Sequence, residues 1–167
     1  MLPLSHAHTR QAETHAILDI GAGLSLTSRH HVYGALHYAT PWRSHTVFLR
    51  IVVWAVILIA LVLSRAKRHT TAGRIARWVC WVVSVRGPVL HIGSFEGFYN
   101  HEVKHALYCG GLPEARRRSL FPPPYEMPSD LLSEATGILH VCLAGMAAYL
   151  LIGLIPQWPQ RGEGGRQ

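Results

Sequence analysis

The sequence is poor in charged residues, and it holds fewer acidic residues than basic ones. Asp, Glu, Lys and Arg make up 15% of the 167 residues, whereas soluble domains carry about 25%. Nine acidic residues stand against 16 Lys and Arg, the formal charge is +7, and the mean hydropathy is +0.17. These values exclude an acidic disordered chain, a collagen and a repeat array, and they argue against an ordinary soluble enzyme.

Several chemical signatures are missing from the sequence. Three cysteines, Cys80, Cys109 and Cys142, are too few and too widely spaced for a disulfide framework. The chain contains no phosphate-binding loop, Gly-x-Gly-x-x-Gly fingerprint, Gly-x-Ser-x-Gly elbow or Cys-x-x-Cys pair. The sequence therefore gives no support for a phosphate-loop NTPase, a dinucleotide oxidoreductase, a serine hydrolase or a thiol-redox enzyme.

Two long apolar runs predict membrane-spanning helices. The first covers residues 47–64 and carries Arg50 as its only charge; as a helix it is about 27 Å long, close to the hydrocarbon thickness of a bilayer. The second covers residues 131–155, with Ser129 or Asp130 as N-cap, a proline-rich loop (121–128) before it and Pro156 after it. We therefore expect an all-α integral membrane protein with two transmembrane helices.

The stretch between the two runs allows two interpretations. Residues 74–92 are apolar enough to embed, but Arg86 would lie near the middle of the bilayer and Pro88 would kink the helix. The stretch is therefore either a third, kinked span or a helical segment lying in the membrane interface, where Trp and Arg are common. After it we expect a short surface helix over residues 95–109.

The ends of the chain differ in composition from its middle. Residues 1–44 contain six of the twelve histidines and no sustained apolar periodicity, which predicts a polar, flexible extension. Residues 45–158 form the predicted helical membrane domain, and residues 159–167 a polar tail. Basic residues gather at positions 65–77 and 116–118, so the positive-inside rule places the connector 65–128 in the cytoplasm.

The last span contains a polar side chain and several small ones. His140 is the one ionisable side chain deep in this run, and such intramembrane groups face a partner or a cavity. Gly137, Gly145 and Gly153 recur every eight residues, beside Ala144. Small residues at this spacing let a neighbouring helix approach closely in lipid. The expected partners are the lipid bilayer, anionic lipid headgroups, and other membrane helices or a second copy, but not nucleic acid.

One motif carries recognisable chemistry. The segment HEVKH at residues 101–105 resembles the H-E-x-x-H signature of zinc metallopeptidases. The resemblance implies that His101 and His105 hold a zinc ion and that Glu102 activates the bound water as the catalytic base. Within this interpretation zinc is the cofactor.

The third zinc ligand is left open by the sequence. Cys109 continues the helical stripe of the two histidines, and His91 or Glu126 are alternatives. His101 and His105 also fit one box of the membrane di-iron desaturases and hydroxylases, and His30-His31 gives half of another, although the chain is short of their ligands and spans. A surface helix with a polar stripe of His101, Lys104 and His105 explains the same residues without a metal.

The sequence therefore predicts location more firmly than activity. We expect a small multi-pass protein of the bacterial inner membrane or plasma membrane, without a demonstrable active site or cofactor, that acts through helix packing or a partner. The alternative is a membrane-bound zinc-dependent hydrolase that uses the HEVKH segment.

Overall fold

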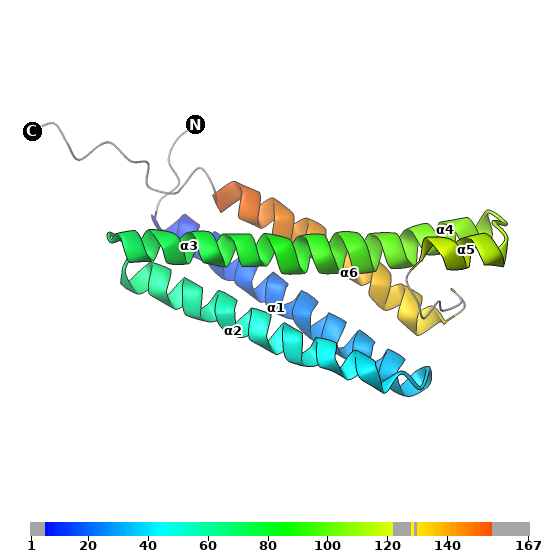
Figure 1. Ribbon diagram of the computed structural model, residues 1–167. Helices are drawn as coiled ribbons and strands as arrows, with labels where there is room; N and C mark the ends of the chain where they lie inside the picture. Colours follow the sequence, from blue (N-terminus) through cyan, green and yellow to red (C-terminus); the bar gives the residue numbers. More distant parts are fainter. Residues whose placement is uncertain (1–5, 122–127, 129, 155–167) are drawn as a thin grey trace, which may run out of the picture.

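The computed structural model of the chain describes residues 6–121, 128 and 130–154. In this part of the chain the regular structure is helical throughout, without strands. Four long helical segments lie side by side as an antiparallel bundle (Figure 1). The elements in chain order are α1 (His6–His37), η1 (Pro41–Arg43), α2 (Ser44–Ala66), α3 (Thr71–Ser84), η2 (Val85–Val103), α4 (Lys104–Cys109), α5 (Glu114–Leu120) and α6 (Leu131–Leu154).

The long helix α1 corrects the expectation of a flexible extension over residues 1–44. Ala16, Ile20, Leu24, Thr27 and His30 are buried in the bundle. They recur every three or four residues, as the positions on one face of a helix do. The face is inconspicuous in the sequence because two of its five members are polar. Burial of this face against the other helices orders α1.

Helices α2 and α6 contain the two apolar runs. Both are long and apolar enough to cross a membrane, and the predicted spans 47–64 and 131–155 coincide with them, apart from Ile155, which lies outside the described residues. Each helix contains an apolar stretch of 18 residues. In α2 only 17% of this stretch is buried inside the bundle, and in α6 only 33%. Large apolar side chains therefore cover much of the outer surface of both helices.

A continuous helical run connects Thr71 to Cys109 through α3, η2 and α4 (Figure 1). It begins at Thr70, whose hydroxyl accepts a hydrogen bond from the backbone N–H of Gly73 at 3.2 Å. The run passes through Pro88 without ending. It joins the helical segment expected over residues 74–92 to residues 95–109, so the expected separate surface helix is not a helix of its own.

Packing against α6 explains why the run continues past the proline. The middle element, η2, has wide π-helical turns, which often occur at functional sites. Its glycines let α6 approach closely, because Gly93 lies against Ala144 and Gly97 against Gly137. These contacts between η2 and α6 extend along the bundle and offset the tendency of a proline to break a helix.

The two basic clusters lie at opposite ends of the bundle. Residues 65–77 surround the turn between α2 and α3, whereas residues 116–118 belong to α5 at the far end (Figure 1). The helical run between them is long enough to cross about 30 Å of hydrocarbon. The positive-inside argument expects the whole connector 65–128 on one side of the membrane. A bundle that crosses a membrane along its long axis would instead place the two basic clusters on opposite sides.

The interior of the bundle has an apolar half and a polar half. The apolar core lies toward the turn between α2 and α3 and consists of Ile20, Leu24, Ile57, Ile92, Ala147 and Leu151. The polar half lies where α1 ends and α6 begins. Most of the proline-rich loop (122–127) and the polar tail (159–167) lie outside the described residues.

Candidate functional site

Eight ionisable side chains from all four long segments meet in the polar half of the bundle. Their relative exposures are low; the side chain of Arg50, for example, is 5% exposed and that of Glu134 is 11% exposed. We call this group the histidine–carboxylate cluster. Its members are His30 and His31 from α1, Arg50 from α2, Glu96, His101 and Lys104 from η2 and α4, and Glu134 and His140 from α6.

His30 lies at the centre of the cluster. Its ring centroid is 4.9 Å from that of His101, 5.5 Å from that of His140 and 5.6 Å from that of His31, and all three contacts are edge-on. Nδ1 of His30 lies 2.7 Å from the hydroxyl oxygen of Thr136. With that hydroxyl donating to the carbonyl oxygen of Leu132 at 2.8 Å, it accepts from His30 in the tautomer that carries the hydrogen on Nδ1.

His140 is held in the same way from the opposite helix. Its Nε2 lies 3.0 Å from the hydroxyl oxygen of Thr27 on α1, and this hydroxyl donates to the carbonyl of Gly23 at 2.9 Å. With its hydroxyl donating there, Thr27 accepts from His140 in the tautomer that carries the hydrogen on Nε2. In the neutral ring Nδ1 is then the basic nitrogen. This atom is buried and has no hydrogen-bond partner among the described residues.

The carboxylate of Glu96 joins three elements. One of its oxygens, Oε1, accepts a hydrogen bond from Nη2 of Arg50 at 2.6 Å and lies 3.4 Å from Nε2 of His91. The other oxygen, Oε2, lies 3.3 Å from Nε2 of His31. Glu96 thus ties η2 to α1 and α2 through charged or polar contacts.

The carboxylate of Glu134 joins α6 to η2 and α4. Its Oε2 lies 3.3 Å from Nδ1 of His101, and its Oε1 lies 3.8 Å from Nζ of Lys104. Together with the pair of Arg50 and Glu96, this arrangement sets two permanent cations against two carboxylates. The cluster is therefore close to electrically neutral when its four histidines are neutral.

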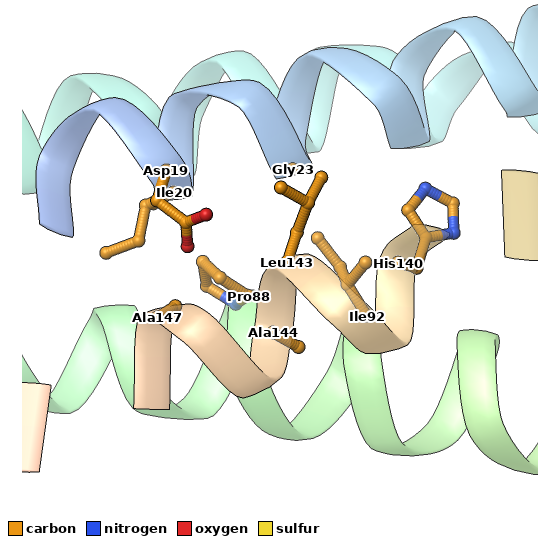
Figure 2. A pocket seen from close by; sticks show the side chains of 9 residues that line it. All are labelled: Asp19, Ile20, Gly23, Pro88, Ile92, His140, Leu143, Ala144 and Ala147. Carbon is orange, nitrogen blue, oxygen red and sulfur yellow. The ribbon is translucent and has the colours of Figure 1, made fainter. Parts of the chain in front are cut away.

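A small cavity beside the cluster lies between α1, η2 and α6. His140 and Asp19 line its two ends, with Pro88 and small or aliphatic side chains between them (Figure 2). The cavity has room for about one water molecule. Oδ2 of Asp19 is buried without a hydrogen-bond partner among the described residues. His140 and Asp19 thus place polar atoms along the cavity, from the cluster toward the apolar half of the interior.

Asp130 closes the polar end of the bundle just before α6. Its carboxylate accepts a hydrogen bond from the hydroxyl of Tyr38 at 2.8 Å and caps α6 through the backbone N–H groups of Leu132 and Ser133. Burial, the largest influence, raises the pKa of Asp130, but the hydrogen bonds from Tyr38, Tyr33 and these backbone groups together outweigh it. The pKa of Asp130 therefore lies below its ordinary value.

The structure separates the residues of the HEVKH segment. His101 is buried and faces Glu134, Glu102 is half-buried, and His105 and Cys109 are exposed on the outer side of the helix. Among the described residues, no group of three His, Cys, Asp or Glu side chains is arranged to hold a metal ion. The structure therefore does not bring together the ligands that the zinc interpretation requires.

The structure also bears on the expected polar stripe of this segment and on the alternative third zinc ligands. The surface helix with a polar stripe of His101, Lys104 and His105 is not formed, because Lys104 is buried together with His101. Of the alternative third ligands, His91 contacts Glu96, and Glu126 lies outside the described residues. The sequence motif marks a helix that contributes to the cluster, but only one of its two histidines does so.

The sequence reasoning identified His140 and missed most of its neighbours. His140 is 1% exposed and hydrogen-bonds to a neighbouring helix, as an intramembrane histidine is expected to do. His30, His31 and Thr27 were missed because they lie in the stretch interpreted as an extension. The paired histidines at positions 30 and 31 were the signal that could have revealed them. No protein-family model, curated protein or solved structure matches the chain.

Proposed function

We propose that the protein is an integral membrane protein whose buried histidine–carboxylate cluster takes up protons and thereby changes the packing of its helices. The distribution of its side chains supports the membrane location. Phe48 and Val62 on α2 are 70% and 63% exposed, whereas Arg50 on the same helix is 4% exposed. Apolar residues outside and charged residues inside are the arrangement that a lipid solvent favours.

The observation that carries the proton-binding proposal is the unpartnered Nδ1 of His140. It is a basic nitrogen, fixed in position by the bond from Nε2 to Thr27, and it is buried in an interior with three further imidazoles. Histidine is the side chain whose ordinary titration falls near physiological pH, at about pH 6.5. A proton that binds to this nitrogen therefore breaks no hydrogen bond among the described residues.

The charge balance of the cluster links proton uptake to helix packing. Within the cluster Arg50 offsets Glu96 and Lys104 offsets Glu134, so an added proton leaves an excess positive charge among its eight side chains. Asp19 is the acidic group that lines the same cavity as His140. Burial opposes a charged imidazole, and in the unfolded chain the same histidines protonate freely. Acid therefore favours looser packing of α1 against α6. In this proposal the protein acts through its helix packing, as the sequence suggests, and acid controls that packing.

The membrane assignment is tested by labelling from the two sides of the membrane. In a chain whose native cysteines are replaced by serine, we expect single cysteines at Thr70 and at Ser119 to react from opposite sides with an impermeant thiol reagent. One should react in intact cells and the other only after the membrane is opened. Reaction of both from one side, or release of the protein by alkaline carbonate, would contradict the assignment.

The proton-binding proposal is tested by following stability against pH. We expect the thermal midpoint of the purified, chelator-treated protein to fall between about pH 7 and pH 5. His140→Gln keeps a donor near Nε2 but cannot be protonated, so it should reduce this fall. His69→Gln, at an exposed position in the turn between α2 and α3, should not. An equal fall in His140→Gln and wild type would overturn the proposal.

The zinc hypothesis is tested separately, by metal analysis of the purified protein before it is treated with chelator. If the protein as purified holds stoichiometric zinc, and His101→Ala loses it, the cluster is a metal site and the zinc-dependent hydrolase gains support.

We further propose that the basic turn at residues 65–77 contacts anionic headgroups on the cytoplasmic side of a bacterial inner or plasma membrane.

A further inference from the structure

We infer that the exposed face of α1 around Arg29 binds a membrane helix of another protein that carries a carboxylate at the same depth. The inference rests on the membrane location proposed above, but not on proton uptake. It starts from a contrast between two outer surfaces. The outer surface of α2 is apolar, whereas that of α1 exposes Gln11, His15, Ser25 and Arg29 among its apolar residues.

The hydrogen bonds of the cluster fix the depth of Arg29. Its neighbour His30 bonds to Thr136, and Thr27, two residues earlier, bonds to His140. Arg29 therefore lies level with residues 136–140 of α6. These residues are about 8 to 14 Å along the helix from Leu131, at 1.5 Å per residue. At this depth a side chain on the outer face of a spanning bundle meets hydrocarbon, where a guanidinium group is costly unless it is paired.

The described part of the chain offers Arg29 no partner. No hydrogen bond or ion pair there involves it, and the two carboxylates of the cluster are already engaged, Glu96 by Arg50 and Glu134 by His101 and Lys104. Arg29 itself points outward. A carboxylate from outside the chain would therefore complete the site, because buried arginines in membranes are paired with acidic groups or backbone carbonyls.

The surface beside Arg29 suits a helix better than a lipid chain. Ser25 and Ala22 lie on the same exposed face, one and two turns away from Arg29 respectively. Small residues let a second helix approach closely, and the serine hydroxyl can bond across the interface. A second copy of this chain is the poorer occupant. Two copies related by an axis along the membrane normal would bring Arg29 next to Arg29, and like charges repel.

The test uses the full chain in lipid nanodiscs and two synthetic membrane-spanning helices. Both peptides are alanine- and leucine-rich with a small-residue stripe; one carries a single Glu at the depth of Arg29 and the other a Gln. We expect energy transfer between labelled partners to show about tenfold tighter binding of the Glu peptide. Arg29→Leu should remove this preference, and Arg29→Lys should keep part of it. Arg118→Leu, at an exposed arginine outside the bundle interior, should leave it intact.

Equal affinity of wild type for the Glu and Gln peptides would overturn the inference. A dimer of the purified protein that Arg29→Leu dissociates would also overturn it, because the occupant would then be a second copy. These outcomes are distinct from failure of the proposed function. A chain that is not retained in nanodiscs contradicts the membrane location, whereas a chain that is retained but shows no pH-dependent stability contradicts proton uptake alone.

Discussion

Gly137 on α6 lies directly against the imidazole of His101 on η2. A Cβ atom at position 137 would overlap with the Cβ, Cγ and Cδ2 atoms of His101. The absence of a side chain at this glycine is therefore what allows His101 to reach Glu134, one turn earlier on the same helix. The close approach of two helices and the geometry of the cluster depend on the same residue.

The first prediction concerns this contact. Gly137→Ala should lower the free energy of unfolding by about 1 to 3 kcal/mol, the usual cost of overpacking a tight contact. Gly145→Ala is the matched control on the same helix, because a Cβ there meets nothing within 4 Å. It should change stability by no more than about 1 kcal/mol, the scale of helix propensity. Thermal unfolding of both variants in one detergent makes the comparison, and equal midpoints would contradict it.

The small-residue face of α6 is thus divided between two surfaces. Gly137 and Ala144 face η2, whereas Gly145 and Gly153 are exposed. Close packing around Gly145 remains a prediction about contacts between molecules. Gly145→Leu should weaken a detergent-resistant oligomer by about 1 kcal/mol or more, and Leu150→Ile should not. Cross-linking of the purified protein measures the difference, and two variants that both behave like wild type would show that Gly145 faces lipid.

A further prediction concerns the buried ion pair of Arg50 and Glu96. Arg50→Leu removes the cation that contacts Glu96 at 2.6 Å and should cost about 3 to 5 kcal/mol, because a buried carboxylate loses its partner. Replacing both residues together should restore a large part of that loss. The control is the pair of Glu114 and Arg118, also 2.6 Å apart but exposed, whose removal should cost about 0 to 1 kcal/mol. A double-mutant cycle in chemical unfolding measures both couplings.

The bond between Thr27 and His140 gives a further prediction. Thr27→Val keeps the shape of the side chain but removes the acceptor for Nε2 of His140, and Thr27 is fully buried. We expect a loss of about 1 to 3 kcal/mol, the cost of an unsatisfied buried donor. Ser25→Ala, at an exposed position two residues away, should be close to neutral. If the two variants unfold at the same temperature, the hydrogen bond contributes nothing to the stability of the bundle.

The last prediction concerns acid and Asp130, which lies outside the predicted spans. Because its pKa is lowered in the folded protein, Asp130 stabilises the fold at pH values above its unfolded pKa. That contribution is lost as the pH falls through the lower, folded pKa. Tyr38→Phe removes one of the hydrogen bonds and should raise the pKa of Asp130, so that the loss begins at a higher pH. Carboxyl NMR titration measures the shift; Tyr149→Phe, at a residue that is 75% exposed, is the control.

The sequence predicted the helices that are apolar throughout and failed on those that are not. α2 and α6 were identified because nearly every residue in them is hydrophobic. α1 was missed because its buried face includes threonine and histidine, which can be buried only when a partner on another helix satisfies them. Thr136 is the partner of His30 and His140 is the partner of Thr27, each more than a hundred residues away along the chain. A local pattern cannot reveal a contact between such distant residues.

The candidate site was predicted in a similarly partial way. The HEVKH segment drew attention to His101, but the motif argument assumed that His101 and His105 share one face. In the structure the buried side of this helix passes through His101 and Lys104 and leaves His105 outside. Which side of the helix faces inward is decided by the close approach at Gly97 and Gly137. That is a property of two helices together.

The separation of the interior into an apolar and a polar half makes the two ends of the molecule unequal. The six residues of the apolar core, Ile57 and Leu151 among them, are all aliphatic, so acid has no group to protonate among them. We expect any acid-induced widening to be confined to the end that holds the histidines. In the membrane location proposed above, a bundle that widens at one end would occupy more area in one leaflet than in the other. Its shape would then depend on the curvature of the surrounding membrane as well as on acidity, and each would influence the other.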